Sequence, residues 1–237
     1  MMNDDSRLPG TLPLDHGLFG RLRRDVAEDW ARYLHHPFLK ALGRGTLPME
    51  GFRRYLIQDY LYLIHYARGY ALSGYKSERL DEIRAASRAL TAILDVELPL
   101  HIAYCQGWGL TESEMAATPE DLRMLAYTRF FLERGLSGDK LDLEVALAPC
   151  IAGYAEIGAL LRADPETVMA GNPYAPWIES YSSEAFQAAA AQAILAIDRL
   201  GAERGAVARY PSLLTTFRAA TRLEAEFWGI GWPKEQV

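Results

Sequence analysis

The chain has 237 residues, half of them hydrophobic and 24% charged, and its formal net charge is −6. These values are typical of a globular protein with one large domain or two small ones. The acidic balance argues against a nucleic-acid partner, because proteins that bind the phosphate backbone usually present basic surfaces. Two cysteines are too few for a disulfide framework, and no run of roughly 18 residues is apolar and free of charges. We therefore expect a cytoplasmic protein that neither spans a membrane nor binds nucleic acid.

Hydrophobic residues recur three and four positions apart along most of the chain, which is the period of amphipathic helices. The first 13 residues are polar and lack the apolar core of a secretory signal, so we expect a loose tail, residues 1–13, before a single domain, residues 14–237. No segment has the pattern of a strand. We predict an all-α fold, a single-domain bundle of about eight helices. The main helices are expected over residues 18–34, 48–75, 81–107, 119–134, 140–161, 172–183 and 184–204, followed by a last helix that ends near Gly229.

Prolines mark three boundaries within this pattern. Pro99 should kink the helix that contains it, and Pro149 should bend another helix one residue before Cys150. Thr118 followed by Pro119 has the signature of a helix start.

The stretch QDYLYLIHY, residues 58–66, places polar groups where the helical period demands apolar ones. A single stripe carries Tyr55, Asp59, Tyr62 and Tyr66 at spacings of three and four residues. A carboxylate on a buried stripe is costly unless another group pairs with it. Asp59 therefore faces either polar core residues or a pocket.

Three other helical stripes show the same anomaly, at Tyr127, Cys150 and Glu224. Tyr154 follows Cys150 on the same stripe. Buried polar groups need partners, so the economical solution is that these groups meet one another in a shared pocket of the bundle. Each of these residues, taken alone, can also have a purely structural role. A single tyrosine on a helix seam commonly belongs to the core, and a single buried cysteine commonly acts as a small hydrophobic residue.

The sequence favours neither a metal nor another cofactor. Glu97 and His101 are four residues apart and can share a helix face. A di-iron bundle, however, needs Glu-x-x-His pairs on two helices, and no such pair is present. No glycine-rich loop of the nucleotide-binding types occurs, and Cys105 beside a glycine-rich helix end is expected to be structural.

Five segments of the chain form a characteristic set: QDYLYLIHY at 58–66, AYTRFFLERG at 126–135, PCIAGYAEIG at 149–158, NPYAPWIESYSS at 172–183 and RLEAEFWG at 222–229. In this order they resemble the TenA proteins, or thiaminase II, of the haem-oxygenase-like fold. The resemblance covers about residues 18–228.

The resemblance implies a role for each matching position. It makes Cys150 the nucleophile and Glu224 the general acid and base, and it places Asp59 on the edge of an aminopyrimidine. Phe227 would stack on the ring. The remaining substrate-binding residues implied by the resemblance are Tyr62, Tyr66, Tyr127, Tyr154 and Tyr181.

The family implies hydrolysis of an aminomethyl-pyrimidine to hydroxymethyl-pyrimidine and ammonia, and cleavage of thiamin by the same chemistry, in thiamin salvage. It also implies a homotetramer, with which exposed aromatic residues near the C-terminus would be compatible. Two alternatives stay open: an oxidase or oxygenase of the same fold, and a non-catalytic regulator or ligand carrier.

Overall fold

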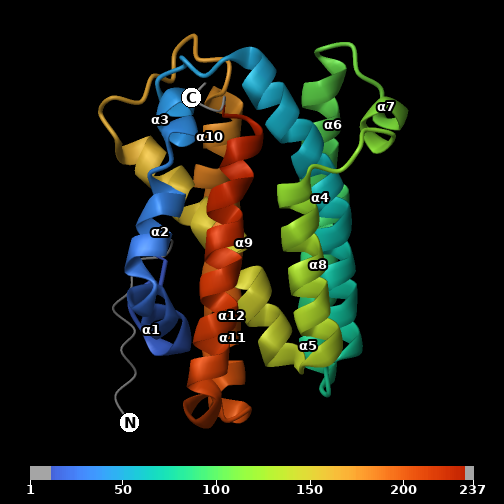
Figure 1. Ribbon diagram of the computed structural model, residues 1–237, viewed down its shortest axis with the longest axis vertical. Helices are drawn as coiled ribbons and strands as arrows, with labels where there is room; N and C mark the ends of the chain where they lie inside the picture. The colour runs from blue at the N-terminus through green and yellow to red at the C-terminus, as the bar shows by residue number, and fades with distance from the viewer. Residues whose placement is uncertain (1–11, 233–237) are drawn as a thin grey trace.

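Long helices lie side by side around one central helix in the computed structural model, which describes residues 12–232 (Figure 1). The central helix is α9, which contacts α2, α4, α8, α10, α11 and α12. No strand occurs within residues 12–232, which confirms the all-α fold. The helices are α1 (Gly17–Asp25), α2 (Ala27–Leu34), α3 (Pro37–Gly43), α4 (Met49–Tyr75), α5 (Leu80–Ala92), α6 (Leu98–Gln106), α7 (Glu112–Ala116), α8 (Leu122–Ser137), α9 (Lys140–Ala163), α10 (Ala175–Ser182), α11 (Glu184–Glu203) and α12 (Ala206–Phe227), with a π-helical turn η1 (Ile93–Glu97) and a 3-10 turn η2 (Trp228–Ile230).

The apolar character of α9 follows from its central position. Among the described residues, α9 alone is long and apolar enough to cross a membrane by length and composition. However, 78% of its most apolar window is buried against other helices of the same chain. Its composition is therefore that of a core helix.

The helix expected over residues 18–34 is divided in two. Val26 leaves helical geometry at φ −119° and ψ 25°, and α2 begins at the next residue. The Val26 side chain is only 3% exposed. The break therefore directs an apolar side chain into the core between the two short helices.

The kink expected at Pro99 takes the form of the π-helical turn η1. Proline has no N–H, so Pro99 cannot bond to the carbonyl of Asp95 in the α-helical pattern. The preceding residue instead pairs one position further back, with Leu98 N–H donating to the Ile93 carbonyl. The turn joins α5 to α6 without ending the helical path.

The helix start expected at Thr118 and Pro119 is wrong by a few residues. Helix α8 begins at Leu122, and Asp121 caps it by accepting the Arg123 N–H at 2.9 Å. Gln58 explains the shift, because its amide binds the Pro119 carbonyl at 2.9 Å and the Asp121 N–H at 2.8 Å. These bonds hold the segment before Asp121 against α4 in a non-helical path.

Two expectations about the chain ends need correction. The predicted tail of residues 1–13 lies outside the described residues as far as residue 11, but Leu12 packs against the core and Pro13 is buried. Near the C-terminus, Trp228 is fully buried and Trp232 packs against the core. Exposed apolar side chains are instead spread over several helices, and five of them, Leu80, Ile83, Leu94, Val96 and Leu100, lie on α5, η1 and α6.

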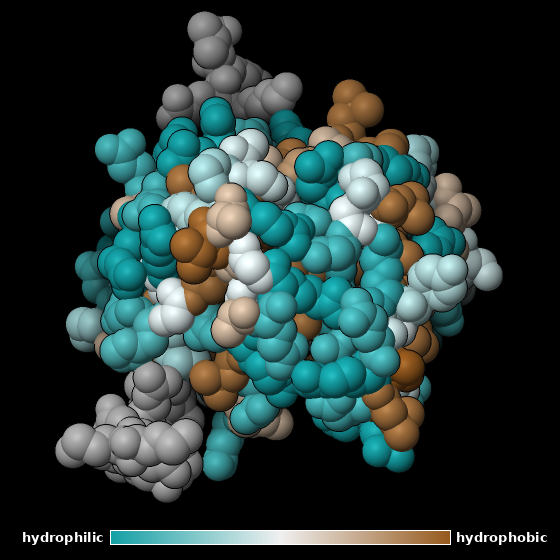
Figure 2. Space-filling view, turned by 90° about the horizontal axis from the view of Figure 1, so that it is seen from below, coloured by the Kyte–Doolittle hydropathy of each residue, from teal (hydrophilic) through white to brown (hydrophobic). Residues whose placement is uncertain are grey.

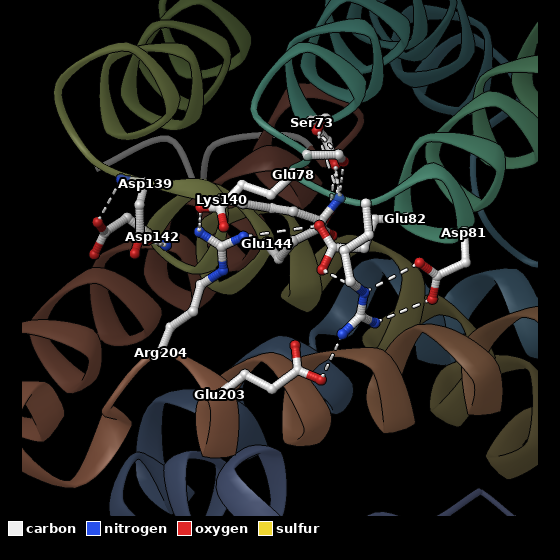
Figure 3. A network of polar contacts seen from close by, with 12 residues as sticks. Ser73, Glu78, Asp81, Glu82, Asp139, Lys140, Asp142, Glu144, Glu203 and Arg204 are labelled. Atoms are coloured by element: carbon white, nitrogen blue, oxygen red, sulfur yellow. Dashed lines mark hydrogen bonds and ion pairs between the residues drawn. The ribbon is translucent and has the colours of Figure 1, made fainter.

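The lower end of the bundle has a mostly hydrophilic surface in which hydrophobic residues are scattered (Figure 2). A network of charged residues joins α4, α5, α9 and α11 there (Figure 3). Lys140 is its buried cation, 4% exposed, with Nζ at 2.8 Å from Ser73 Oγ and 3.5 Å from the Glu144 carboxylate. The Ser73 hydroxyl in turn donates to the same carboxylate at 2.5 Å.

Replacing Lys140 with methionine is expected to lower the free energy of unfolding by about 3 kcal/mol, because it leaves the Glu144 charge partly buried without its counterion. Urea denaturation of the purified variant measures the change. Lys40→Met, on an exposed face of α3, is the matched control and should stay within about 0.5 kcal/mol of the wild type. A loss at Lys140 no larger than that of the control would contradict a stabilising role for the buried pair.

Candidate active site

Helix α4 carries Asp59 into the centre of the bundle, where it is 3% exposed. The Tyr55 hydroxyl, one turn earlier, donates to Asp59 Oδ2 at 3.1 Å, and it lies 3.2 Å from the Tyr154 hydroxyl on α9. Asp59 therefore has a partner on its own helix, Tyr55, and is connected through it to α9.

His101 on α6 is the charged partner of Asp59. Its Nδ1 lies 2.9 Å from the main-chain oxygen of Glu97, and its Nε2 lies 2.7 Å from Asp59 Oδ2. A carbonyl oxygen only accepts, so Nδ1 carries a proton, and Nε2 of a neutral ring would then offer only a lone pair to a carboxylate. An imidazolium satisfies both contacts. Burial acts to lower the pKa of His101, but the hydrogen bond to Asp59 and its charge outweigh burial and raise it.

Both contacts to Asp59 end on the same oxygen, Oδ2. Within residues 12–232, no protein group occupies Oδ1 with a hydrogen bond. A carboxylate oxygen held rigid in this way can accept hydrogen bonds from a ligand.

Tyrosine hydroxyls from three helices hold the backbone of α9 just ahead of Cys150. Tyr127 on α8 donates to the Ala146 carbonyl, and Tyr66 on α4 donates to the Leu147 carbonyl, each at 3.3 Å. Tyr33 on α2 donates to the Pro149 carbonyl, also at 3.3 Å. Pro149 has no N–H to bond to the Val145 carbonyl, and these three bonds fix the backbone next to that missing bond.

Cys150 lies among buried neighbours but keeps part of its surface accessible. Burial raises the pKa of its thiol well above the ordinary value, and the nearby carboxyl groups of Glu224 and Glu97 raise it further. The Tyr62 hydroxyl acts in the opposite direction. The thiol is therefore protonated at neutral pH in the ligand-free protein.

Glu224 on α12 is a second buried acid, 2% exposed. Burial raises its pKa to about 8, although polar interactions with Tyr127, Tyr33 and Cys150 lower it. Its Oε1 and the Tyr62 hydroxyl are both buried and form no hydrogen bond to any protein group in residues 12–232. Buried polar atoms of this kind point to a bound partner, because an unpaired polar group in the core is costly.

Aromatic rings enclose the polar groups. The Tyr62 ring stacks on Tyr66 and Tyr127 at centroid distances of 5.4 and 5.5 Å and meets the Phe227 ring edge-on at 5.6 Å. The rings of Tyr154 on α9 and Tyr181 on α10 lie 4.9 Å apart. The site is thus suited to a flat ligand that carries hydrogen-bonding groups on its edge.

The sequence matches the profile of the TENA/THI-4/PQQC family over residues 23–233. The chain belongs to the TENA/THI-4/PQQC family. One relative is an aminopyrimidine aminohydrolase of Halalkalibacterium halodurans, 36% identical, with the match covering 86% of this chain and 90% of the relative. Another, of the same description, is from Bacillus subtilis and is 31% identical over 90% of this chain and 89% of the relative. A crystal structure described as a TenA family transcription regulator, from Silicibacter sp. TM1040, superposes with a TM-score of 0.85 at 42% identity over 93% of this chain and 99% of its own.

This TENA/THI-4/PQQC member brings all nine predicted site residues to one place between α4, α8, α9, α10 and α12. Cys150, Glu224 and Asp59 interact electrostatically with one another. The aromatic members line the same space, but the hydroxyls of Tyr66 and Tyr127 are engaged with α9 carbonyls. The nine residues are Asp59, Tyr62, Tyr66, Tyr127, Cys150, Tyr154, Tyr181, Glu224 and Phe227.

Four further residues join the site without having been assigned to it from the sequence. Tyr55 lies on the same helical stripe as Asp59, and the spacing of Glu97 and His101 places them on one face of a helix. The sequence therefore contained a pattern that could have assigned all three to the site. No such pattern marks Tyr33, because it lies beside the main apolar stripe of its helix. No group of three or more His, Cys, Asp or Glu side chains within the described part of the chain is arranged to hold a metal ion.

Proposed function

We propose that the protein is a hydrolase acting on C–N bonds, an aminopyrimidine aminohydrolase of the thiaminase II type. It would convert 4-amino-5-aminomethyl-2-methylpyrimidine and water to the hydroxymethyl-pyrimidine and ammonia, and cleave thiamin by the same chemistry, in thiamin salvage. The observation that carries this proposal is a protonated thiol, Cys150, that interacts with a carboxylic acid, Glu224, among aromatic side chains. Relatives that bear the name aminopyrimidine aminohydrolase support it.

The first step adds the thiol across the electron-poor pyrimidine ring. The Cys150 sulfur forms a bond to a ring carbon while the S–H bond breaks, and Glu224 delivers a proton to a ring nitrogen as it takes up the thiol proton. The net change is addition of S–H to the ring, so no charge is created in the buried site. The raised pKa values of both groups therefore suit this step, because each begins protonated.

The adduct then expels the leaving group from the methylene carbon. The electrons released by the ring nitrogen break the exocyclic C–N bond, and ammonia leaves after it gains a proton. Water adds to the exposed methylene, and loss of the thiol restores the aromatic ring and the Cys150 S–H bond. Glu224 is the group placed to move protons in both directions.

Asp59 holds the substrate. The 4-amino group of the pyrimidine donates hydrogen bonds, and the unoccupied Oδ1 is a matching acceptor. The imidazolium of His101 lies 2.7 Å from the other oxygen and fixes the orientation of the side chain. Tyr62 and Tyr154 would orient the groups on the ring or the attacking water, and Phe227 would pack on the ring.

Asp59→Asn is expected to lower kcat/KM for the aminomethyl-pyrimidine by about 10- to 100-fold, mainly through KM, because an ionic hydrogen bond to the substrate is lost. Steady-state ammonia release measures both constants. Asp15→Asn, on an exposed carboxylate, serves as the control. An unchanged KM in Asp59→Asn would remove Asp59 from substrate recognition.

The proposed function is tested by incubating the purified protein with the aminomethyl-pyrimidine and quantifying ammonia and hydroxymethyl-pyrimidine in equal amounts. Dioxygen consumption and metal content, measured in the same preparation, test the oxidase alternative. A gel-shift assay at low salt tests direct DNA binding by a regulator, a description that one solved relative carries. Absence of ammonia release would overturn the proposal.

The protein's surroundings are part of the same proposal. We place it in the cytoplasm as a homotetramer that acts on small molecules, without a nucleic-acid or membrane partner. The exposed apolar side chains of α5, η1 and α6 are the described surface that an assembly of several copies would cover. Light scattering of the purified protein checks the number of subunits.

A further inference from the structure

Glu97 is a third carboxyl group of the pocket, and the proposed reaction does not use it. It ends the π-helical turn η1 and interacts electrostatically with Asp59. Its side chain accepts a hydrogen bond from the Tyr181 hydroxyl at 3.2 Å, and its main-chain carbonyl accepts one from His101 at 2.9 Å. One residue is therefore joined to both walls of the site.

These bonds belong to a closed series of contacts among six residues of the site. Tyr55 connects Asp59 on one side to the Tyr154 hydroxyl at 3.2 Å on the other. The ring of Tyr154 lies 4.9 Å from that of Tyr181 at an interplanar angle of 59°. The series runs from Glu97 through His101, Asp59, Tyr55, Tyr154 and Tyr181 and returns to Glu97. Each link is a hydrogen bond, except the ring contact between Tyr154 and Tyr181.

The Tyr181 hydroxyl has a single protein partner within residues 12–232, the Glu97 carboxylate. Its ring has neighbours at Tyr154, Trp177 and Phe186, with tilted or edge contacts that permit other orientations. A carboxylate acceptor fixes the ring more firmly than packing does, because ionic hydrogen bonds are stronger and directional. Burial raises the pKa of Glu97 to about 7, while the hydrogen bond from Tyr181 acts to lower it, so the carboxylate that accepts this bond prevails above about pH 7.

We propose that Glu97 is a positioning residue: its carboxylate anchors the Tyr181 hydroxyl and thereby fixes the Tyr181 ring as the substrate-facing wall next to Tyr154. The inference rests on the proposed function for its kinetic consequence. Its structural content, the orientation of the Tyr181 ring, does not depend on the reaction.

A double-mutant cycle tests the proposal. Glu97→Ala and Tyr181→Phe are each expected to lower kcat/KM for ammonia release by about 10-fold, because each removes the same ionic hydrogen bond. The double variant should be no worse than the more affected single variant, within about threefold. Glu97→Gln keeps an acceptor oxygen and should recover most of the loss. Asp95→Ala, an exposed acid on the same turn, is the control and should behave as the wild type.

Crystal structures of Glu97→Ala and Glu97→Gln give a readout that is independent of activity. The Tyr181 ring should be displaced in the alanine variant and in place in the glutamine variant. A ring that stays in place in Glu97→Ala, additive losses in the cycle, or no rescue by glutamine would each overturn the positioning role. Absence of ammonia release from the wild type would instead overturn the proposed function, and the two crystal structures would still decide the role of Glu97.

Discussion

Replacing Cys150 with serine is expected to reduce the rate of ammonia release by about 10³-fold or more, with little change in the affinity for the product pyrimidine. A serine hydroxyl is a far weaker nucleophile than a thiol, and Glu224, whose pKa is about 8, is protonated at neutral pH and cannot act as its base. Losses of this size are common when the nucleophile of a covalent mechanism is removed. Single-turnover ammonia release measures the chemical step, and calorimetry with hydroxymethyl-pyrimidine measures binding.

The second cysteine provides a matched control. Cys105 is fully buried on α6, and burial raises the pKa of its thiol to about 11. Cys105→Ser should therefore keep the wild-type rate, apart from a loss of stability. Full activity in Cys150→Ser would show that a thiol adduct is not on the reaction path.

Glu224→Gln is expected to lower kcat by about 10²- to 10⁴-fold, the usual range for loss of a general acid and base. The amide keeps the size of the carboxyl group but cannot deliver a proton. In the wild type, activity should fall as the pH rises through about 8, because Glu224 then loses the proton that the first step requires. The pH profile of kcat/KM for wild type and variant checks both statements.

The same substitution should change stability in the opposite direction. The raised pKa means that between about 4.5 and about 8 the folded protein keeps a proton on Glu224 that the unfolded chain releases. Stability due to the neutral carboxyl is therefore lost as the pH rises through this window, by at most about 1.4 kcal/mol per pH unit. Glu224→Gln should gain stability relative to the wild type between pH 5 and pH 8 in urea denaturation. A difference that does not depend on pH would contradict a protonated Glu224 in the folded state.

The sequence was sufficient to predict the all-α fold and the grouping of most residues of the candidate site, because both depend on helical period. Asp59, Tyr127, Cys150 and Glu224 each interrupt an apolar stripe, and the structure brings the four helices together. The resemblance to TenA proteins added Tyr181, which lies in a short helix whose period alone is too brief to assign a face. The reaction itself is a proposal, whether it is argued from the helical pattern of these residues or from the resemblance to TenA proteins.

Other features depend on contacts that no local pattern records. Gln58 shifts the start of α8 from a helix more than 50 residues away. Tyr33 reaches the Pro149 carbonyl across the bundle, and nothing in its own helix distinguishes it from a core tyrosine. The protonated state of His101 follows from the carbonyl of Glu97, a main-chain group that has the same chemistry in every residue.

The π-helical turn makes the pocket tolerant of a change in chain length at one point. Its hydrogen bond spans one more residue than an α-helical bond, so η1 accommodates one residue in excess of a regular helix. Deletion of one exposed position, such as Asp95, would convert the turn to regular α-helical pairing and leave the buried faces of α5 and α6 in their present orientation. A relative whose alignment has a one-residue gap here can therefore keep the contact between His101 and Asp59.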